Sequence, residues 1–186
     1  MRGVVYTELV GFLDKTGGQI FAEEVLSRAN LPHGGAYSPT GYYPWEEAVR
    51  VVGVAAELGE IDMTVLCRAF GEYLFERFAI LYAEIVGRYS SAEALLAHVN
   101  DHIHHEVRAL HPRSAPPSVV SRSEGDTIVI TYASHRPFAH IAHGLVSGVM
   151  KHFGDTRDLD WIGVSDDCTA ASFAISGTQQ VSACPA

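Results

Sequence analysis

Residues 100–117 read NDHIHHEVRALHPRSAPP, and the interpretation of the whole chain starts from this stretch. Four histidines fall within ten of its residues: His102, His104, His105 and His111. They come near the end of an apolar pattern with helical spacing. The Pro116-Pro117 pair then ends the helix, because proline lacks the backbone donor and also restricts the residue before it. The stretch therefore predicts a histidine-bearing helix that stops at a defined place.

A second polar motif follows fifteen residues after the prolines, inside a β-branched run. Side chains alternate between the faces of a strand, so Tyr132, Ser134 and Arg136 are expected to point to the same side. Two hydroxyls and a guanidinium make a receptor for carboxylates or phosphates; the alternative is an ordinary sheet face with a surface ion pair. A helix histidine opposite such a strand matches haem, which needs an axial imidazole and donors for its propionates.

Helical geometry alone does not choose among the histidines. Val99, Ile103 and Val107 mark the apolar face, and His102 and His104 lie on its two flanks. A different set shares one face of the same helix at positions i, i+4 and i+7, and it could chelate Zn²⁺ or Ni²⁺: His98, His102 and His105. The alternative for that set is a solvated polar face.

Composition limits the class of protein. The 186 residues suit one domain, and 47% hydrophobic with 19% charged residues is typical of a globular chain. A net charge of -9 argues against nucleic acid or an anionic membrane surface as partner. Apolar runs stop well short of the roughly 18 residues that a membrane span needs. We therefore expect no nucleic acid partner and no membrane association.

The start of the chain and its cysteines indicate a cytoplasmic protein. Glu8 interrupts the N-terminal apolar segment and no small-residue cleavage pattern follows, so no signal peptide is expected. Cys67, Cys168 and Cys184 are too few and too scattered for a disulfide framework.

Hydrophobic periodicity predicts an α+β fold. Helices are expected over residues 1–15, 20–29 and 45–58, from Asp62 to about Val86, and from Ser90 or Ser91 to about Leu110. Hairpins are expected from residues 118–121 with 127–133 and from 159–164 with 169–175, with a helix over 137–153 between them. Residues 1–176 would form one domain with a helical part, about 1–62, and an α/β part with an antiparallel sheet, about 63–176. The tail, 177–186, is expected to be loose.

Six short motifs occur in a characteristic order along the chain. They are Met1-x-Gly3, Phe70-Gly71-Glu72-Tyr73, His104-x-x-Val107, Pro112 with Pro116-Pro117-Ser118, Tyr132-x-Ser134-x-Arg136, and Gly144-Leu145 ahead of Gly148. Each is weak alone, but in this order and at this spacing the chain resembles the H-NOX family. These are haem nitric-oxide/oxygen-binding domains, related to the sensory domain of soluble guanylate cyclase. The resemblance spans residues 1 to about 176, with haem buried between the two parts.

The resemblance implies roles for five residues. His104 would be the proximal iron ligand, and Tyr132, Ser134 and Arg136 would hold the propionates. Pro117 resembles the residue that presses on the macrocycle and bends it. The haem would be haem b, held non-covalently, because the sequence has no CxxCH attachment motif.

The resemblance also implies a distal wall and a gas preference. The wall would consist of Val5, Leu9, Leu74 and Ile141. Family members that hold O₂ stably place a tyrosine hydroxyl near the bound gas, and Ile141 stands at the corresponding position here. Without a donor the pocket should bind NO and CO and bind O₂ poorly. A shift of one residue in this placement would bring His140 inward instead.

The expected function is a bacterial-type gas sensor rather than an enzyme. No GxSxG, phosphate loop or HExxH motif is present. Gas binding would bias a two-state switch in which the iron–His104 bond weakens and the N-terminal helices move relative to the sheet half. A separate partner, a histidine kinase or a diguanylate cyclase, would read that motion. The rival interpretations are a haem redox protein and a histidine-rich metal-binding protein.

Overall fold

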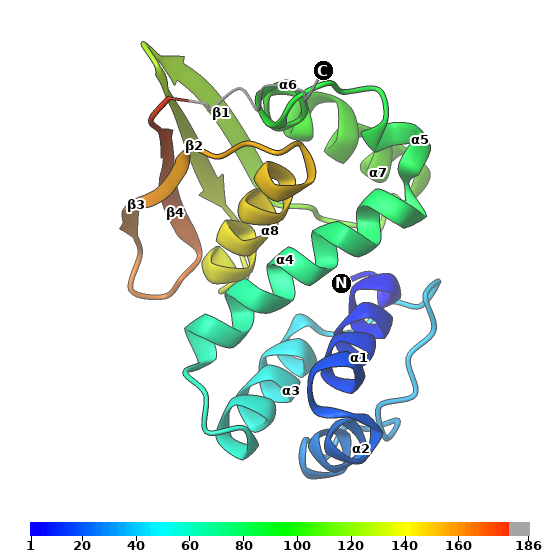
Figure 1. The fold of residues 1–186 in the computed structure, drawn as a ribbon. Helices are drawn as coiled ribbons and strands as arrows, with labels where there is room; N and C mark the ends of the chain where they lie inside the picture. The colour runs from blue at the N-terminus through cyan, green and yellow to red at the C-terminus, as the bar shows by residue number, and fades with distance from the viewer. Residues whose placement is uncertain (179–186) are drawn as a thin grey trace, which may run out of the picture.

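The computed structural model describes residues 1–178 of the chain (Figure 1). Residues 179–186, which include Cys184 and most of the predicted loose tail, lie outside the described part. Three helices come first: α1 (Gly3–Gly17), α2 (Gln19–Arg28) and α3 (Trp45–Leu58). α1 ends because Gly18 takes a φ of 82°, a conformation that glycine adopts without steric cost. These helices match the predicted ranges closely.

The long helix α4 (Met63–Leu81) lies between the N-terminal helices and the rest of the chain (Figure 1). The Asp62 side chain caps it, as predicted, by accepting from the backbone N–H groups of Thr64 and Val65. The prediction of one helix as far as Val86 is wrong. Tyr82 leaves the helical region at φ -124° and ψ 38°, so the chain breaks there and restarts as α5 (Ala83–Val86).

The histidine-bearing helix is also interrupted, which corrects the prediction of a single helix. It consists of α6 (Ala92–Ala97), a π-helical turn (Val99–Ile103) and α7 (His104–Leu110). Within the π turn the Ile103 N–H donates to the carbonyl of His98, five residues back, at 3.2 Å. The extra residue in this turn rotates every later side chain by about 100° relative to a continuous α-helix.

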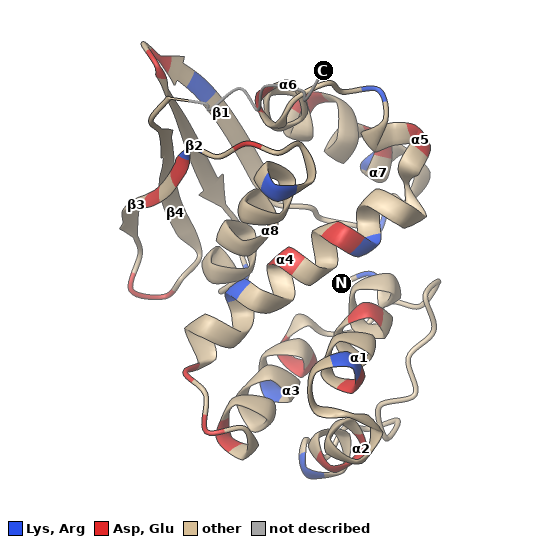
Figure 2. Cartoon of the chain, viewed as in Figure 1, with Lys and Arg blue, Asp and Glu red and all other residues tan. Residues whose placement is uncertain are grey.

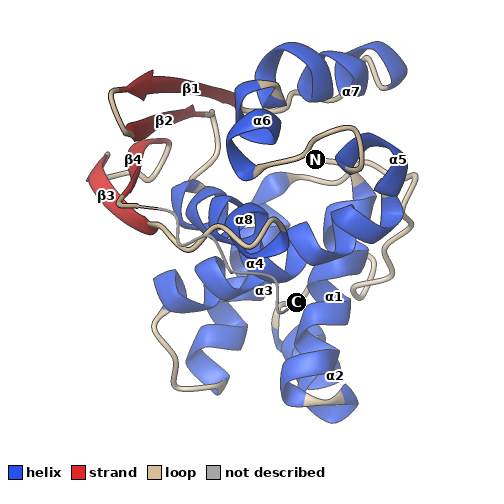
Figure 3. Ribbon diagram, turned by 45° about the horizontal axis from the view of Figure 1, so that its top comes forward, coloured by secondary structure: helices blue, strands red, loops and turns tan. Residues whose placement is uncertain are grey.

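The C-terminal part holds a four-stranded antiparallel sheet with strand order β1-β2-β4-β3. Both predicted hairpins are present: β1 (Ser118–Glu124) with β2 (Thr127–Ala133), and β3 (Asp158–Val164) with β4 (Ala170–Ser176). Tyr132 on β2 pairs with Ala171 on β4. The predicted α+β class is therefore confirmed, with the sheet beside the helices (Figure 3).

Helix α8 (Ala139–His152) lies between the sheet and α4 (Figures 1 and 3). The two helices approach closely because glycines face each other: a Cβ on Gly71 would meet the Ile141 carbonyl, and one on Gly144 would meet the Arg68 carbonyl. One apolar core packs α1, α2 and α3 against α4, and a second fills the space between α8 and the sheet.

Charged side chains are dispersed over this framework. Figure 2 shows Lys and Arg scattered along the helices with Asp and Glu among them. Among residues 1–178, no helix combines the length and hydropathy that a membrane crossing would take.

Candidate functional site

One large cavity lies among α1, α4, α7, α8 and the β1–β2 hairpin. Its volume is about 690 Å³, within the range typical of small-molecule sites. Most of its lining is apolar, including Phe70 and Phe75 of α4 and Leu145 of α8. All nine predicted site residues line it: Val5, Leu9, Leu74, His104, Pro117, Tyr132, Ser134, Arg136 and Ile141. Tertiary packing therefore gathers one candidate site from residues up to 136 positions apart in the sequence.

His104 is the first residue of α7 and is half-buried, with its side chain lining the cavity. Burial lowers the pKa of its imidazole from 6.5 to about 4; the Pro117 carbonyl acts in the opposite direction and Arg108 adds to the lowering. At neutral pH the ring is therefore uncharged, the form in which an imidazole donates a lone pair to a metal. Its Nδ1 is buried and forms no hydrogen bond of ordinary geometry within residues 1–178.

The structure separates the histidines that helical geometry left undecided. His104 and His111 line the cavity, whereas His102 lines a second, smaller pocket with His98. His105 is exposed and lines neither. The three histidines at i, i+4 and i+7 are therefore not brought together, and within residues 1–178 no group of three or more His, Cys, Asp or Glu side chains is arranged to hold a metal ion.

The motif Tyr132-x-Ser134-x-Arg136 straddles the end of a strand. β2 ends at Ala133, so only Tyr132 lies in a strand, and the expectation that all three residues share one strand is wrong. Ser134 follows in a loop: its backbone N–H donates to the Thr169 carbonyl at 2.9 Å, and its Oγ accepts from the Arg136 N–H at 3.2 Å. These bonds hold the loop so that Ser134 and Arg136 still turn toward the cavity.

Arg136 is a half-buried cation without a full set of partners. Burial is the main cause that lowers its pKa, with the nearby Tyr132 and Tyr6 acting in the opposite direction. Its Nε is buried and forms no hydrogen bond within residues 1–178. Within residues 1–178, five buried side-chain nitrogen or oxygen atoms form no hydrogen bond. Three of these atoms belong to residues that line the cavity: His104, Ser114 and Arg136. Unpaired buried polar groups are costly, so their concentration here indicates a site for a polar ligand.

The opposite part of the lining is apolar. Leu9, Leu74 and Ile141 are 1%, 3% and 9% exposed, and Val5 packs beside them. None of these four side chains carries a hydrogen-bond donor.

Several cavity residues were not expected from the sequence. Ser114 had no signal beyond its place before the proline pair. His140 was assigned to the surface, but it lines the cavity, lies with its Nδ1 3.3 Å from an Arg68 nitrogen and packs against Trp161. Cys67 lines it too, and burial raises the pKa of its thiol to about 11, which makes it a poor thiolate ligand.

Fold and site together define an α+β domain with one large apolar cavity, lined by an uncharged histidine and by a guanidinium with two hydroxyls. The sequence model of the Haem-NO-binding family matches residues 2–160, and the chain belongs to that family, the H-NOX domains. No curated protein sequence matches the chain.

Solved H-NOX structures share the fold at low sequence identity. The unliganded Fe(II) H-NOX A71G mutant from K. algicida is 22% identical with a TM-score of 0.89, over 97% of this chain and 98% of that one. An S. oneidensis H-NOX in the Fe(II)NO state is 21% identical with a TM-score of 0.87, over 95% and 98%. The NMR structure of a Shewanella oneidensis H-NOX domain in the Fe(II)CO state is 21% identical with a TM-score of 0.83, over 97% and 99%. At this identity the likeness establishes the fold alone.

The residues of the cavity fit a haem group. A neutral imidazole suits its iron, a guanidinium and two hydroxyls suit its two carboxylates, and the apolar lining suits its macrocycle. The unpaired Nδ1 of His104 and Nε of Arg136 belong to two of the side chains that such a group would engage.

Proposed function

We propose that this protein is a haem-based gas sensor that binds nitric oxide and carbon monoxide at ferrous haem and binds O₂ poorly. One observation carries the proposal: a single cavity brings together the neutral His104, the Tyr132–Ser134–Arg136 motif and a wall without donors. Membership of the Haem-NO-binding family supports it independently.

In this proposal His104 would hold the iron of haem b, and Pro117 would contact the macrocycle. Haem supplies the iron atom that takes a diatomic gas. The protein itself would position the haem. Burial keeps His104 uncharged, and the hydrogen bond from the Arg136 N–H to Ser134 Oγ fixes the loop that would receive the two propionates. The haem is held without covalent attachment, because no cysteine precedes a histidine in a CxxCH motif.

Gas preference follows from the wall formed by Val5, Leu9, Leu74 and Ile141. Bound O₂ accumulates negative charge on its outer atom and is stabilised by a hydrogen-bond donor, while NO and CO gain little from one. These four side chains offer no donor. These four side chains also carry no acid–base group, and a haem redox enzyme would need one on the distal side, which disfavours that rival interpretation.

The output would be a conformational signal rather than a reaction. Val5 and Leu9 belong to α1, whereas His104 begins α7, so the two sides of the cavity lie on different parts of the fold. Gas binding would weaken the bond between the iron and His104 and release the contact with Pro117. The N-terminal helices would then shift relative to the sheet half. A separate histidine kinase or diguanylate cyclase in the cytoplasm would read that shift. The activity of that kinase or cyclase, measured with and without the NO-loaded protein, tests whether it reads the shift.

The decisive experiment is the optical spectrum of the reduced protein under nitrogen, then with NO, then with air. We expect a Soret band that shifts with NO and not with air. A stable O₂ complex would contradict the donor-free wall, and the absence of a Soret band after haem addition would contradict haem binding.

A matched pair of variants tests the ligand. His104→Gly should lose tight haem retention and regain it when imidazole is supplied, because free imidazole can fill the vacated position. His105→Gly, on the neighbouring exposed residue, should keep the native spectrum. Haem retained with an unchanged spectrum in His104→Gly would refute the assignment.

A further inference from the structure

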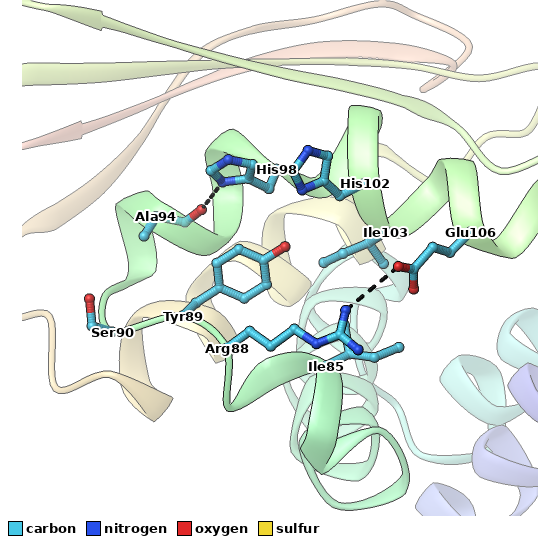
Figure 4. A pocket seen from close by; sticks show the side chains of 9 residues that line it. All are labelled: Ile85, Arg88, Tyr89, Ser90, Ala94, His98, His102, Ile103 and Glu106. Atoms are coloured by element: carbon cyan, nitrogen blue, oxygen red, sulfur yellow. Dashed lines mark hydrogen bonds and ion pairs between the residues drawn. The ribbon is translucent and has the colours of Figure 1, made fainter.

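A second pocket of about 370 Å³ lies beside the π-helical turn (Figure 4). Its lining includes Arg88 and Tyr89 from the segment after α5, His98 and His102 around the turn, and Glu106 of α7. It shares wall residues with the large cavity, but neither His98 nor His102 belongs to that cavity. The proposed function therefore makes no use of these two histidines.

His98 and His102 are one helical turn apart, and the His102 N–H donates to the His98 carbonyl at 3.1 Å. Figure 4 shows the two imidazoles side by side, with ring centroids 4.6 Å apart and planes at 43°. Metal–nitrogen bonds of about 2.0–2.1 Å place two adjacent imidazole ligands with their ring centres roughly 4.5–5 Å apart. The observed separation is therefore compatible with two histidines that share one metal ion.

The tautomer of His98 also suits a metal. Its Nδ1 lies 2.7 Å from the Ala94 carbonyl (Figure 4). Because a carbonyl can only accept, Nδ1 carries the hydrogen and Nε2 keeps its lone pair. Metal-binding histidines commonly use their second ring nitrogen in this way, which fixes the ring and raises the basicity of the ligating atom.

We propose that His98 and His102 form a binding site for a divalent transition-metal cation of the Zn²⁺ or Cu²⁺ class, completed by water. Imidazole ligands select these ions over Mg²⁺ and Ca²⁺, which prefer oxygen. Two histidines at i, i+4 on one face are a recurrent basis of zinc sites. The site differs from the three-histidine set that the sequence suggested, because His105 takes no part.

Glu106 lies one turn beyond His102 and could add a third ligand. It is now paired with Arg88 at 3.6 Å, with the two side chains 47% and 61% exposed (Figure 4). Such an exposed pair is worth little, so a metal ion could draw the carboxylate away. A metal held by His98 and His102 would also brace the π turn that leads directly into His104.

The test is isothermal titration of tag-free protein, carrying its own cofactor, with ZnCl₂ in a non-chelating buffer. We expect one Zn²⁺ per chain. His98→Asn, whose amide can still donate to the Ala94 carbonyl, should weaken binding by about tenfold or more, because the loss of even an outer-shell partner of a metal ligand costs about 10–100-fold in affinity. His102→Gln, at an exposed position, should do the same without disturbing the fold.

His105→Asn is the matched control, because it removes an exposed histidine from the same helix. Its affinity for Zn²⁺ should equal that of the unchanged protein. The proposal is overturned if the unchanged protein binds no Zn²⁺, or if both His98→Asn and His102→Gln bind it as tightly as His105→Asn does. The haem spectrum reports separately on the proposed function, so the failure of one proposal does not imply failure of the other.

Discussion

Replacing Gly144 by alanine should loosen the contact between α4 and α8. A Cβ at this position would press on the carbonyl oxygen of Arg68, with the Arg68 carbonyl carbon 2.9 Å away and its Cα 3.0 Å away. Ordinary contacts of a Cβ begin at 3.4 Å, and backbone atoms cannot rotate aside as a side chain can. The backbone of α4 and that of α8 must therefore move apart to admit the Cβ.

The expected cost follows from two opposing effects. Overpacking a well-filled contact costs about 1–3 kcal/mol. Alanine is better than glycine inside a helix by about 0.5–1 kcal/mol, which offsets part of that cost. The net loss in the free energy of unfolding is about 1–2 kcal/mol. With a urea m-value of about 2 kcal/mol/M, the unfolding midpoint should fall by about 0.5–1 M.

Gly53→Ala is the matched control, because a Cβ on Gly53 meets no atom within 4 Å and this residue also lies inside a helix. At this position only the higher helix propensity of alanine changes the stability, so the urea midpoint should rise by about 0.3–0.5 M. Urea unfolding followed by far-UV circular dichroism, at equal cofactor occupancy, measures both. A Gly144→Ala midpoint at or above that of the unchanged protein would refute the close-packing argument.

Three further predictions concern the rest of the fold. Asp62→Ala removes the α4 cap and should lower the urea midpoint, while Asp62→Asn should lower it less; equal urea midpoints would contradict the cap. Arg77→Met leaves the carboxylate of Glu8, now 2.7 Å from the Arg77 Nε, without its partner and should lower the urea midpoint, whereas Lys15→Met, at the more exposed pair with Glu76, should change the midpoint little. Burial, with Arg68 and His140, lowers the pKa of the His143 imidazole to about 4. As the pH falls, the imidazole therefore gains its proton in the unfolded chain before it does so in the folded one. The free energy of unfolding should thus fall as the pH drops from about 6.5 toward 4. After allowance for solvent screening, the loss between pH 7 and pH 5 should be about 1 kcal/mol, and His143→Phe should lack this part of the pH dependence.

Local signals predicted most of the secondary structure. α3 spans Trp45–Leu58 as expected, because its apolar spacing is regular and Gly59 follows it. Asp62 caps α4, and the turn residues between the β-branched runs mark both hairpins. These features depend on side chains acting on backbone within a few positions, which a sequence displays directly.

The breaks inside helices could not be predicted in the same way. The apolar pattern runs through Tyr82 without interruption, yet α4 ends there, where the Tyr82 ring packs on Phe78 with centroids 5.6 Å apart. The π turn has no residue that forces it, since Val99–Ile103 contains neither proline nor glycine. Such breaks are set by packing against distant elements, so a local pattern does not show them.

The sequence by itself determined which chemical groups the site contains: imidazoles near a proline pair, and two hydroxyls with a guanidinium in and after a β-branched run. Only the tertiary structure decided how they are used. The π turn rotates the residues that follow it, so His104 lines the large cavity while His102 joins His98 in another pocket. Ser134 and Arg136 reach the cavity through a loop tied to Thr169, a residue thirty-five positions beyond Ser134. Residue types are local information, whereas the direction in which a side chain points depends on contacts made across the whole fold.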